Sequence, residues 1–185
     1  MFRTWSDPEG SSHNDLCLGV PFYLIMNMHE EYMKKALREA EKAKEKDEVP
    51  VGCVIVKDGK VIARAHNLRE KSQTVVSHAE ILAIQKASRK LGTWCLDECD
   101  LYVTLEPCMM CYGAIYHSQI RNLYYGASDE KAGCVESLID VKSIRHIGSH
   151  PNASGGYLKK ECAQILKDFF KEKRKRAKRK KSEFR

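Results

Sequence analysis

The sequence predicts an α/β fold, a three-layer α/β/α sandwich with a central mixed sheet. Helical and strand-like patterns alternate in the order αββαβαβ, and strands separated by helices imply right-handed crossovers and a parallel segment. An Asp-Gly pair between two apolar β-branched runs adds an antiparallel hairpin at one edge. The chain has 185 residues, 43% of them hydrophobic, which suits one domain with one core.

The first elements are a helix and a hairpin. From Glu30 to Lys46, apolar residues recur at three- and four-residue spacing among Glu and Lys, which predicts an amphipathic surface helix. The runs 51–56 and 61–65 flank the turn residues 57–60, Lys-Asp-Gly-Lys. They are predicted to pair as antiparallel strands.

A helix and a buried strand follow the hairpin. Residues 78–91 are predicted to be helical, with Ser77 as the N-cap and Gly92 as the stop. The run 101–105 (LYVTL) reads as a short strand that ends at Pro107.

The remaining pattern contains two helices and one strand. Residues 108–118 are predicted as a helix that begins just after a proline, and residues 122–125 as a strand that closes at Gly126. Residues 135–156 are rich in Gly, Ser and His and carry no clear pattern, whereas residues 158–175 predict a last amphipathic helix.

Positive charge is concentrated at the carboxyl end. The formal net charge is +7, but residues 171–185 alone hold ten Lys or Arg and two Glu, which leaves the other 170 residues at about −1. Such a block is either a solvated tail or a phosphate-binding arm. We therefore expect a leader at 1–27, disordered or derived from a misassigned start, a domain at 28–170 and a basic tail at 171–185.

The eight cysteines do not indicate a secreted disulfide framework, because the sequence carries no secretory signal pattern. A reducing, cytoplasmic location is expected. The apolar run 16–26 is interrupted by Gly19 and Pro21 and is far shorter than the ~20 residues of a membrane-spanning helix. No membrane segment is predicted.

The pair Cys108 and Cys111 is the main indication of a functional site in the sequence. A C-x-x-C pair at a helix start has three readings: half of a closed structural zinc site, a redox pair, or two ligands of a catalytic zinc site. A closed site needs four ligands, often from a second C-x-x-C pair, and the sequence has no second C-x-x-C; Cys95 and Cys99, spaced C-x₃-C, are the weaker alternative ligands. A thioredoxin-type motif would follow the first strand, whereas this pair follows the third.

His78 and Glu80 favour the catalytic reading. With Pro107 before Cys108, they complete H-x-E…P-C-x-x-C, the signature of zinc-dependent nucleobase deaminases. His78, Cys108 and Cys111 would hold one Zn²⁺ per chain and leave a fourth position for a nucleophilic water. Glu80, beside the metal but not on it, is the candidate proton shuttle.

Several sequence blocks resemble the bacterial tRNA-specific adenosine deaminases, a family of the cytidine deaminase-like superfamily. The resemblance covers roughly residues 30–175 and rests on EVPVG at 48–52, AHNLRE at 65–70, HAE at 78–80, LYVTLEPCMMC at 101–111 and GASD at 126–129. It implies a cytidine deaminase-like fold, a homodimer, and hydrolytic conversion of adenosine to inosine at the wobble position of an arginine tRNA anticodon.

The resemblance also implies contacts with the flipped adenine, with neighbouring nucleotides and with the anticodon loop, made by Asn67, the backbone of Ala79, Asp129, Lys131, Phe170 and Arg174. Structural alternatives stay open: Asn67 as a strand cap, Asp129 in a turn, and Phe170 in the core, since Phe169 and Phe170 cannot both face inward. The chain departs from the family at Val75–Ser77 and Tyr112, and 142–157 matches poorly, which weakens an RNA role for His150.

An RNA substrate is favoured over a free base. Anticodon loops present unstacked bases, and a basic tail attracts phosphates that a neutral nucleoside lacks. The alternative within the same chemistry is a deaminase of free nucleobases or nucleosides. From another class, a zinc-bearing RNA-binding protein without catalysis is disfavoured by the presence of Glu80.

Overall fold

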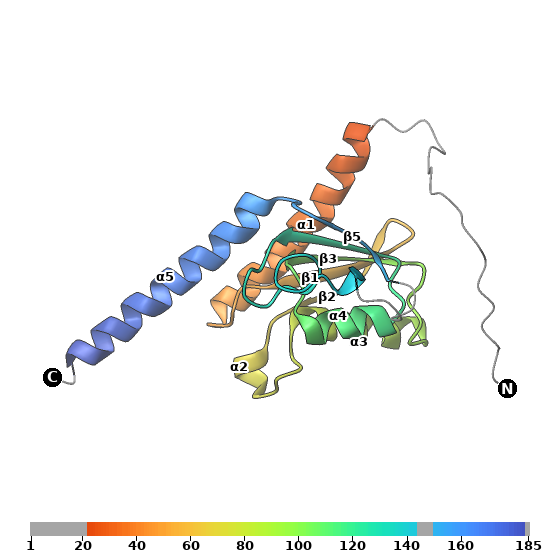
Figure 1. The fold of residues 1–185 in the computed structure, drawn as a ribbon. Coiled ribbons are helices and arrows are strands. Elements are labelled where there is room, and N and C mark those ends of the chain that lie inside the picture. Colours follow the sequence, from red (N-terminus) through yellow and green to blue (C-terminus); the bar gives the residue numbers. More distant parts are fainter. Residues whose placement is uncertain (1–21, 144–149, 184–185) are drawn as a thin grey trace.

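A five-stranded mixed sheet forms the centre of the molecule (Figure 1). The computed structural model describes residues 22–143 and 150–183. The strand order is β2-β1-β3-β4-β5; β1 pairs antiparallel with β2 and β3, and β3, β4 and β5 run parallel. In chain order the elements are α1 (Phe22–Glu45), β1 (Gly52–Lys57), β2 (Lys60–His66), α2 (Arg69–Ser72), α3 (Ala79–Leu91), β3 (Cys99–Leu105), α4 (Met109–His117), β4 (Asn122–Ala127), the 3-10 turn η1 (Val141–Ser143), β5 (Asn152–Gly155) and α5 (Lys159–Glu183).

The predicted hairpin is confirmed at the edge of the sheet. Its two turn residues, Asp58 and Gly59, have φ of 49° and 70°, the left-handed conformations that a two-residue type I′ turn requires. Asp and Gly adopt these angles at low cost, so the turn sequence fixes the register of β1 against β2.

Helices cover both faces of the sheet, which confirms the three-layer α/β/α prediction. Helices α1 and α5 pack on one face around Met33, Tyr102 and Cys162, and α3 and α4 pack on the other around Ala83, Leu101 and Ile115. Alternate residues of β3 therefore enter opposite cores, as a strand buried on both faces requires.

A close contact sets the position of α1 on β1. A Cβ added at Gly52 would lie 2.0 Å from the carbonyl oxygen of Ala36 and 2.4 Å from the backbone nitrogen of Ala40. Only glycine fits there, so the helix backbone rests directly on the first residue of β1.

Several boundaries differ from the sequence prediction, and three of the differences concern the two ends of the chain and the start of α3. Helix α1 begins at Phe22 rather than Glu30, so residues 22–27 of the expected leader are helical, and residues 1–21 lie outside the described part. Helix α5 continues to Glu183, through most of the expected tail. The predicted cap Ser77 is wrong: the N-cap of α3 is His78, and the Ser77 hydroxyl instead accepts a hydrogen bond from Ser72, at 2.7 Å.

Besides the 3-10 turn η1, two short elements, β5 and α2, were not predicted. β5 (NASG) is an edge strand whose side chains are largely exposed, and it joins the sheet through backbone pairing with β4. α2 has four residues and no buried side chain. Neither contributes an apolar pattern, which explains why periodicity did not reveal them. None of the helices in the described ranges is long and apolar enough to cross a membrane.

Candidate metal centre and active site

The amino-terminal ends of α3 and α4 meet at the carboxyl edge of the parallel strands. His78 and Cys108 occupy the N-cap positions of these helices in extended conformations, with φ, ψ of −75°, 154° and −74°, 171°. Their carbonyl oxygens accept the first helical hydrogen bonds from Leu82 and Tyr112, at 3.0 and 2.8 Å. Their side chains make no capping bonds and so remain available to each other.

His78, Cys108 and Cys111 come together with the spacing of metal ligands. Nδ1 of His78 lies 3.8 Å from the Cys108 sulfur and 3.5 Å from the Cys111 sulfur, and the three ligand atoms lie within 4.8 Å of one another. Tetrahedral Zn²⁺ with bonds of about 2.3 Å to sulfur and 2.0–2.1 Å to nitrogen separates such atoms by about 3.6 Å. The donor set and its spacing therefore fit zinc.

Hydrogen bonds among the two sulfurs and the imidazole shift the pKa values of all three groups. Hydrogen bonds from Cys111 and His78 lower the pKa of Cys108 to about 4 despite its burial. The hydrogen bond with Cys108, followed by burial, raises the pKa of Cys111. The pKa of His78 is raised because its hydrogen bond with Cys108 outweighs burial. A thiolate is thus already favoured in the cluster, as metal binding requires.

Glu80 lies in the first turn of α3 and is only 4% exposed. Its Oε2 atom has no hydrogen-bond partner among the described residues, which is costly for a buried oxygen unless a ligand satisfies it. Burial raises the pKa of Glu80, so the carboxyl group holds a proton more readily near neutral pH. These are the properties expected of a group that both takes and gives a proton.

A cavity of about 210 Å³ opens in front of this cluster. Asn67, Ala79 and Asp129, which the resemblance assigned to substrate, line it together with His78 and Glu80. Ala79 is the first residue of α3 and is fully buried. The structure therefore brings these three predicted contacts to one space with the metal-ligating cluster.

Glu48 holds Asn67 in place, a role that sequence reasoning missed. Its buried carboxylate accepts hydrogen bonds from the Asn67 side-chain nitrogen at 3.3 Å and from the backbone N–H groups of Glu70 and Lys71, at 3.1 and 2.6 Å. The contact fixes one side of the cavity wall. The signal in the sequence was a charged residue directly before the apolar run Val49–Val51.

Glu106 is a second buried carboxylate at the cavity. It accepts hydrogen bonds from the backbone N–H groups of Asp129, Val135, Glu136 and Ser137, at 2.9–3.0 Å, and from the Ser137 hydroxyl. Burial alone would raise the pKa of Glu106, but these bonds outweigh it and lower the pKa. The residue ties the loop after β4 to the start of α4.

Asp129 has two roles in the structure. It lines the cavity, and its Oδ1 accepts the backbone N–H groups of Lys131 and Ala132, at 3.0 and 3.3 Å, so the turn alternative also holds. The side chain of Lys131 is exposed and does not line the cavity.

Phe170 and Arg174 lie on α5, outside the cavity wall. Phe169 is the ring that enters the core, at 4% exposure, whereas Phe170 is 43% exposed and Arg174 is exposed. The alternative of Phe170 as a core residue is therefore wrong.

The weaker candidates do not join the cluster. Cys95 donates a hydrogen bond to the Gln119 side chain at 3.0 Å, and Cys99 is buried in β3. His150 is hydrogen-bonded to the Tyr112 hydroxyl at 2.9 Å. Within the described ranges, His78, Cys108 and Cys111 are the one group whose atoms lie close enough to hold a metal ion.

Fold and site together define the class. A mixed α/β sheet that brings His-x-Glu and Pro-Cys-x-x-Cys to two adjacent helix starts is the arrangement of the nucleobase deaminases. Residues 27–174 match the family described as MafB19-like deaminase.

More specific relatives place the chain within that class. It is 46% identical over 153 residues to the tRNA-specific adenosine deaminase of Bacillus subtilis, covering 83% of this chain and 95% of the relative. It is 48% identical over 143 residues to the enzyme of that name from Agrobacterium fabrum, covering 77% and 94%. A solved structure from a study of A-to-I editing by tRNA:A34 deaminases is 47% identical, with a TM-score of 0.72, covering 74% of this chain and 99% of that one. The chain belongs to the family of tRNA-specific adenosine deaminases.

Proposed function

We propose that this protein converts adenosine to inosine by hydrolysis at the wobble position of a tRNA anticodon, with arginine tRNA as the expected substrate. The observation that carries the proposal is the 46–48% identity to tRNA-specific adenosine deaminases over 94–95% of their length. The zinc signature alone does not define the base, because deaminases of several bases share it.

The metal site is proposed to hold one Zn²⁺ through His78, Cys108 and Cys111. The chemistry that Zn²⁺ supplies when bound is Lewis acidity, which makes a water nucleophilic near neutral pH. Two thiolates offset its charge, and the neutral imidazole provides the third bond. Support comes from the 3.5 and 3.8 Å separations between His78 Nδ1 and the two sulfurs.

Glu80 is proposed to move the protons. The attacking water forms a bond to C6 of adenine, and Glu80 takes one of its protons and passes it to the ring nitrogen. Glu80 then carries the second proton of the same oxygen to the amine, so that C6=O forms as the C6–N bond breaks and ammonia leaves. A carboxyl group whose pKa burial has raised can accept and release a proton at neutral pH.

Asn67 and the backbone of Ala79 are proposed to hold the flipped adenine, since both line the cavity beside Glu80. The hydrogen bond from the Asn67 nitrogen to Glu48 fixes the amide, and its oxygen is then the group that can accept a bond from the base. Asp129 and Lys131 would hold neighbouring nucleotides, and Phe170 and Arg174 the anticodon loop.

The working enzyme is further proposed to be a cytoplasmic homodimer that binds the anticodon stem-loop. A cytoplasmic location is where tRNA substrates are available. Dimerisation rests on the family resemblance and is testable by light scattering of the purified chain.

The test is inosine formation at the wobble adenosine of an arginine-anticodon stem-loop by zinc-loaded protein. Free adenosine is assayed in parallel, and the Glu80→Ala protein serves as the control. We expect inosine in the stem-loop alone and none with the variant. Equal or faster deamination of free adenosine would instead support the nucleoside alternative, and no inosine in either substrate would contradict the proposal.

A further inference from the structure

The carboxyl-terminal part of α5 projects beyond the body of the molecule (Figure 1). We call residues 171–183 the basic arm; nine of its residues are Lys or Arg and two are Glu. At 1.5 Å per residue it is about 20 Å long. From 171 to 182 every side chain is exposed except that of Lys173. The match to the MafB19-like deaminase family ends at residue 174, so most of the arm lies beyond the matched residues.

The arm cannot be explained by packing. Its charges surround the helix, so it has no apolar face to bury against the domain. Cations also stand four residues apart, as at Lys171 and Lys175 or Arg176 and Lys180, and like charges at this spacing destabilise a helix. A polyanion lying along the arm would offset that repulsion, whereas a neutral partner would not.

Asp47 fixes the arm to the domain. Its carboxylate accepts hydrogen bonds from Lys173 Nζ at 2.5 Å and from Arg176 Nη1 at 3.1 Å. Phe169, the last buried residue before the arm, lies under Lys173, whose Nζ is 5.4 Å from the ring centroid. These contacts hold successive turns of α5 and thereby set the direction in which the arm leaves.

The base of the arm is linked to the cavity wall. Asp47 directly precedes Glu48, which hydrogen-bonds Asn67 in the cavity. Glu48 also binds the backbone of α2, and Figure 1 shows α5 extending past the body on the side where α2 lies. An RNA loop entering the cavity would therefore have its stem within reach of the arm.

We propose that the basic arm binds the phosphate backbone of the base-paired stem below the substrate loop, and that Asp47 is a positioning residue that aims it. This inference rests on the proposed RNA substrate. To the loop contact proposed for Arg174 at the base of the arm, it adds a second contact region on the stem, made by the arm residues after Arg174. Double-stranded RNA suits such a surface, because it is recognised mainly through shape and backbone contacts. The arm would supply affinity without reading sequence.

The first test compares two hairpins with the same anticodon loop, one with the full stem and one with the shortest stem that keeps the loop closed. Binding is measured by fluorescence anisotropy and turnover by inosine formation. The arm variant changes four exposed residues to Gln: Lys178, Arg179, Lys180 and Lys181. The control removes the same charge elsewhere, by changing Arg89, Lys90, Lys159 and Lys160 to Gln.

We expect the wild type to bind the full stem at least ~10-fold more tightly than the short stem, and the arm variant to bind both alike. The slope of log affinity against log salt on the full stem should become shallower by about 3 in the arm variant. The control should retain the stem preference. An equal loss on both hairpins, or no loss, would overturn the proposal.

The second test uses Asp47→Asn. Asp47 has a φ of 62°, and Asn also adopts this left-handed conformation, so the backbone is preserved while the charge is lost. General electrostatics predicts tighter RNA binding, because a negative charge is removed. A positioning role predicts the opposite: several-fold weaker binding to the full stem, with the short stem unchanged. Tighter binding to both hairpins would refute the positioning role.

The outcomes separate this inference from the proposed activity. Stem-dependent binding without inosine would leave the arm proposal standing and contradict the deaminase assignment. Inosine formation with equal affinity for both hairpins would support the deaminase assignment and overturn the arm proposal. If the protein sediments with anionic lipid vesicles only when the arm is intact, and binds the two hairpins equally, the arm binds membranes and the RNA-stem proposal is overturned.

Discussion

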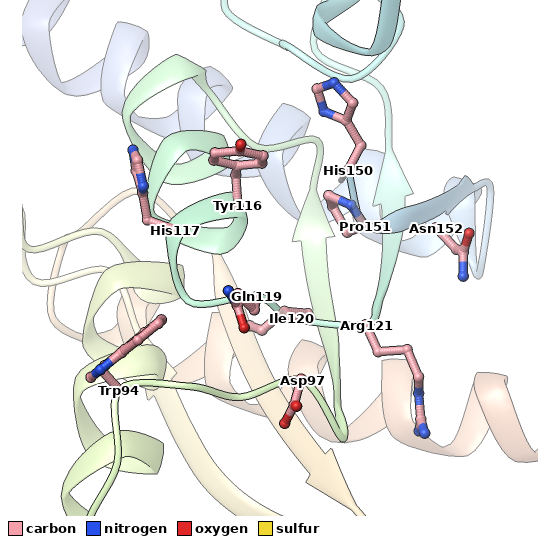
Figure 2. Close-up of a pocket in the computed structure, with 10 residues that line it drawn as sticks. All are labelled: Trp94, Asp97, Tyr116, His117, Gln119, Ile120, Arg121, His150, Pro151 and Asn152. Atoms are coloured by element: carbon pink, nitrogen blue, oxygen red, sulfur yellow. The ribbon is translucent and has the colours of Figure 1, made fainter. Parts of the chain in front are cut away.

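The two ends of helices α3 and α4 face two different cavities. At their amino ends lies the small cavity of about 210 Å³ with His78, Cys108 and Glu80. At the opposite edge, before β3, β4 and β5 begin, lies a cavity of about 840 Å³ lined by Trp94, His117 and His150, among others (Figure 2). The larger cavity has aromatic rings and two histidines, but Figure 2 shows the imidazoles on either side of the Tyr116 ring.

The comparison shows that a chemical site is marked by reactive side chains that lie close together, and not by the volume of its cavity. Helix starts direct backbone N–H groups and a positive dipole at thiolates and carboxylates, whereas helix ends offer carbonyl groups. The carboxyl edge of a parallel sheet is also where ligands bind in open α/β folds. Paired substitutions at the two ends test this comparison.

The largest effect is expected at Glu80. Glu80→Gln keeps the shape of the side chain but removes the carboxyl group proposed to move the protons, so inosine formation should fall by about 10²–10⁴-fold. The far-end control, His117→Ala, should leave turnover unchanged. Single-turnover inosine assays measure both. Retention of more than about a tenth of the activity by Glu80→Gln would contradict the catalytic role.

Metal binding should give the next effect. Cys111→Ser should lower the zinc content of the purified chain well below one ion and reduce thermal stability, since a ligand present at a thousand times its Kd stabilises the fold by about 4 kcal/mol. Cys95→Ser, near the far cavity, should retain one zinc per chain. Elemental analysis and thermal unfolding provide the readouts; full zinc occupancy in Cys111→Ser would disprove the ligand assignment.

A smaller effect is expected at Glu106. Glu106→Gln removes the negative charge and replaces one of the two acceptor oxygens with an NH2 group that faces N–H and O–H donors, at a cost of about 2–3 kcal/mol. Because the pKa of Glu106 is lowered in the folded protein, its contribution is present above its ordinary value of 4.5 and is lost as the pH falls through the lower folded value.

The stability gap between wild type and Glu106→Gln should therefore close on acidification, as followed by urea denaturation at several pH values. The matched control is Glu98→Gln, which removes an exposed ion pair with Lys57 at the amino end of β3. It should change stability by less than about 1 kcal/mol. A gap that widens at low pH would rule out this account.

The smallest effect is expected at Trp94. Its side chain is 66% exposed at the rim of the large cavity. Trp94→Ala should change the free energy of unfolding by less than about 0.5 kcal/mol and leave inosine formation intact. A large loss of turnover with unchanged zinc content would show that the far cavity contributes to function.

Periodicity and turn chemistry predicted most of the fold. The hairpin at Asp58-Gly59 and the alternation of helices with strands followed from local patterns that the tertiary structure preserves. β5 was missed because an edge strand needs backbone pairing but no apolar run. Helix α1 was placed too short, because its first turns lie in a segment whose apolar residues lack a clear period.

The site was partly visible in the sequence. Residue spacing and helix starts predicted His78, Cys108 and Cys111. Each part of the motif is a short stretch at one helix start, and the single strand β3 connects the two helices. Glu48 and Glu106 were missed because their partners are backbone N–H groups from other loops, which leave no pattern in the sequence. The orientation of α5 was equally hidden, since Asp47 and Lys173 are far apart in the chain.

The first turns of α3 and α4 lack a side-chain capping hydrogen bond, so the sequence gives up some helix stability at both places. Asp, Asn or Ser at an N-cap commonly stabilises a helix by about 1 kcal/mol over residues that do not cap, yet His78 and Cys108 occupy both positions without a capping bond. A design that replaced Cys108 with Asp would satisfy the helix and weaken the thiolate site. Selection for helix stability alone would therefore erode this centre, and stability-guided redesign of the protein should hold both caps fixed.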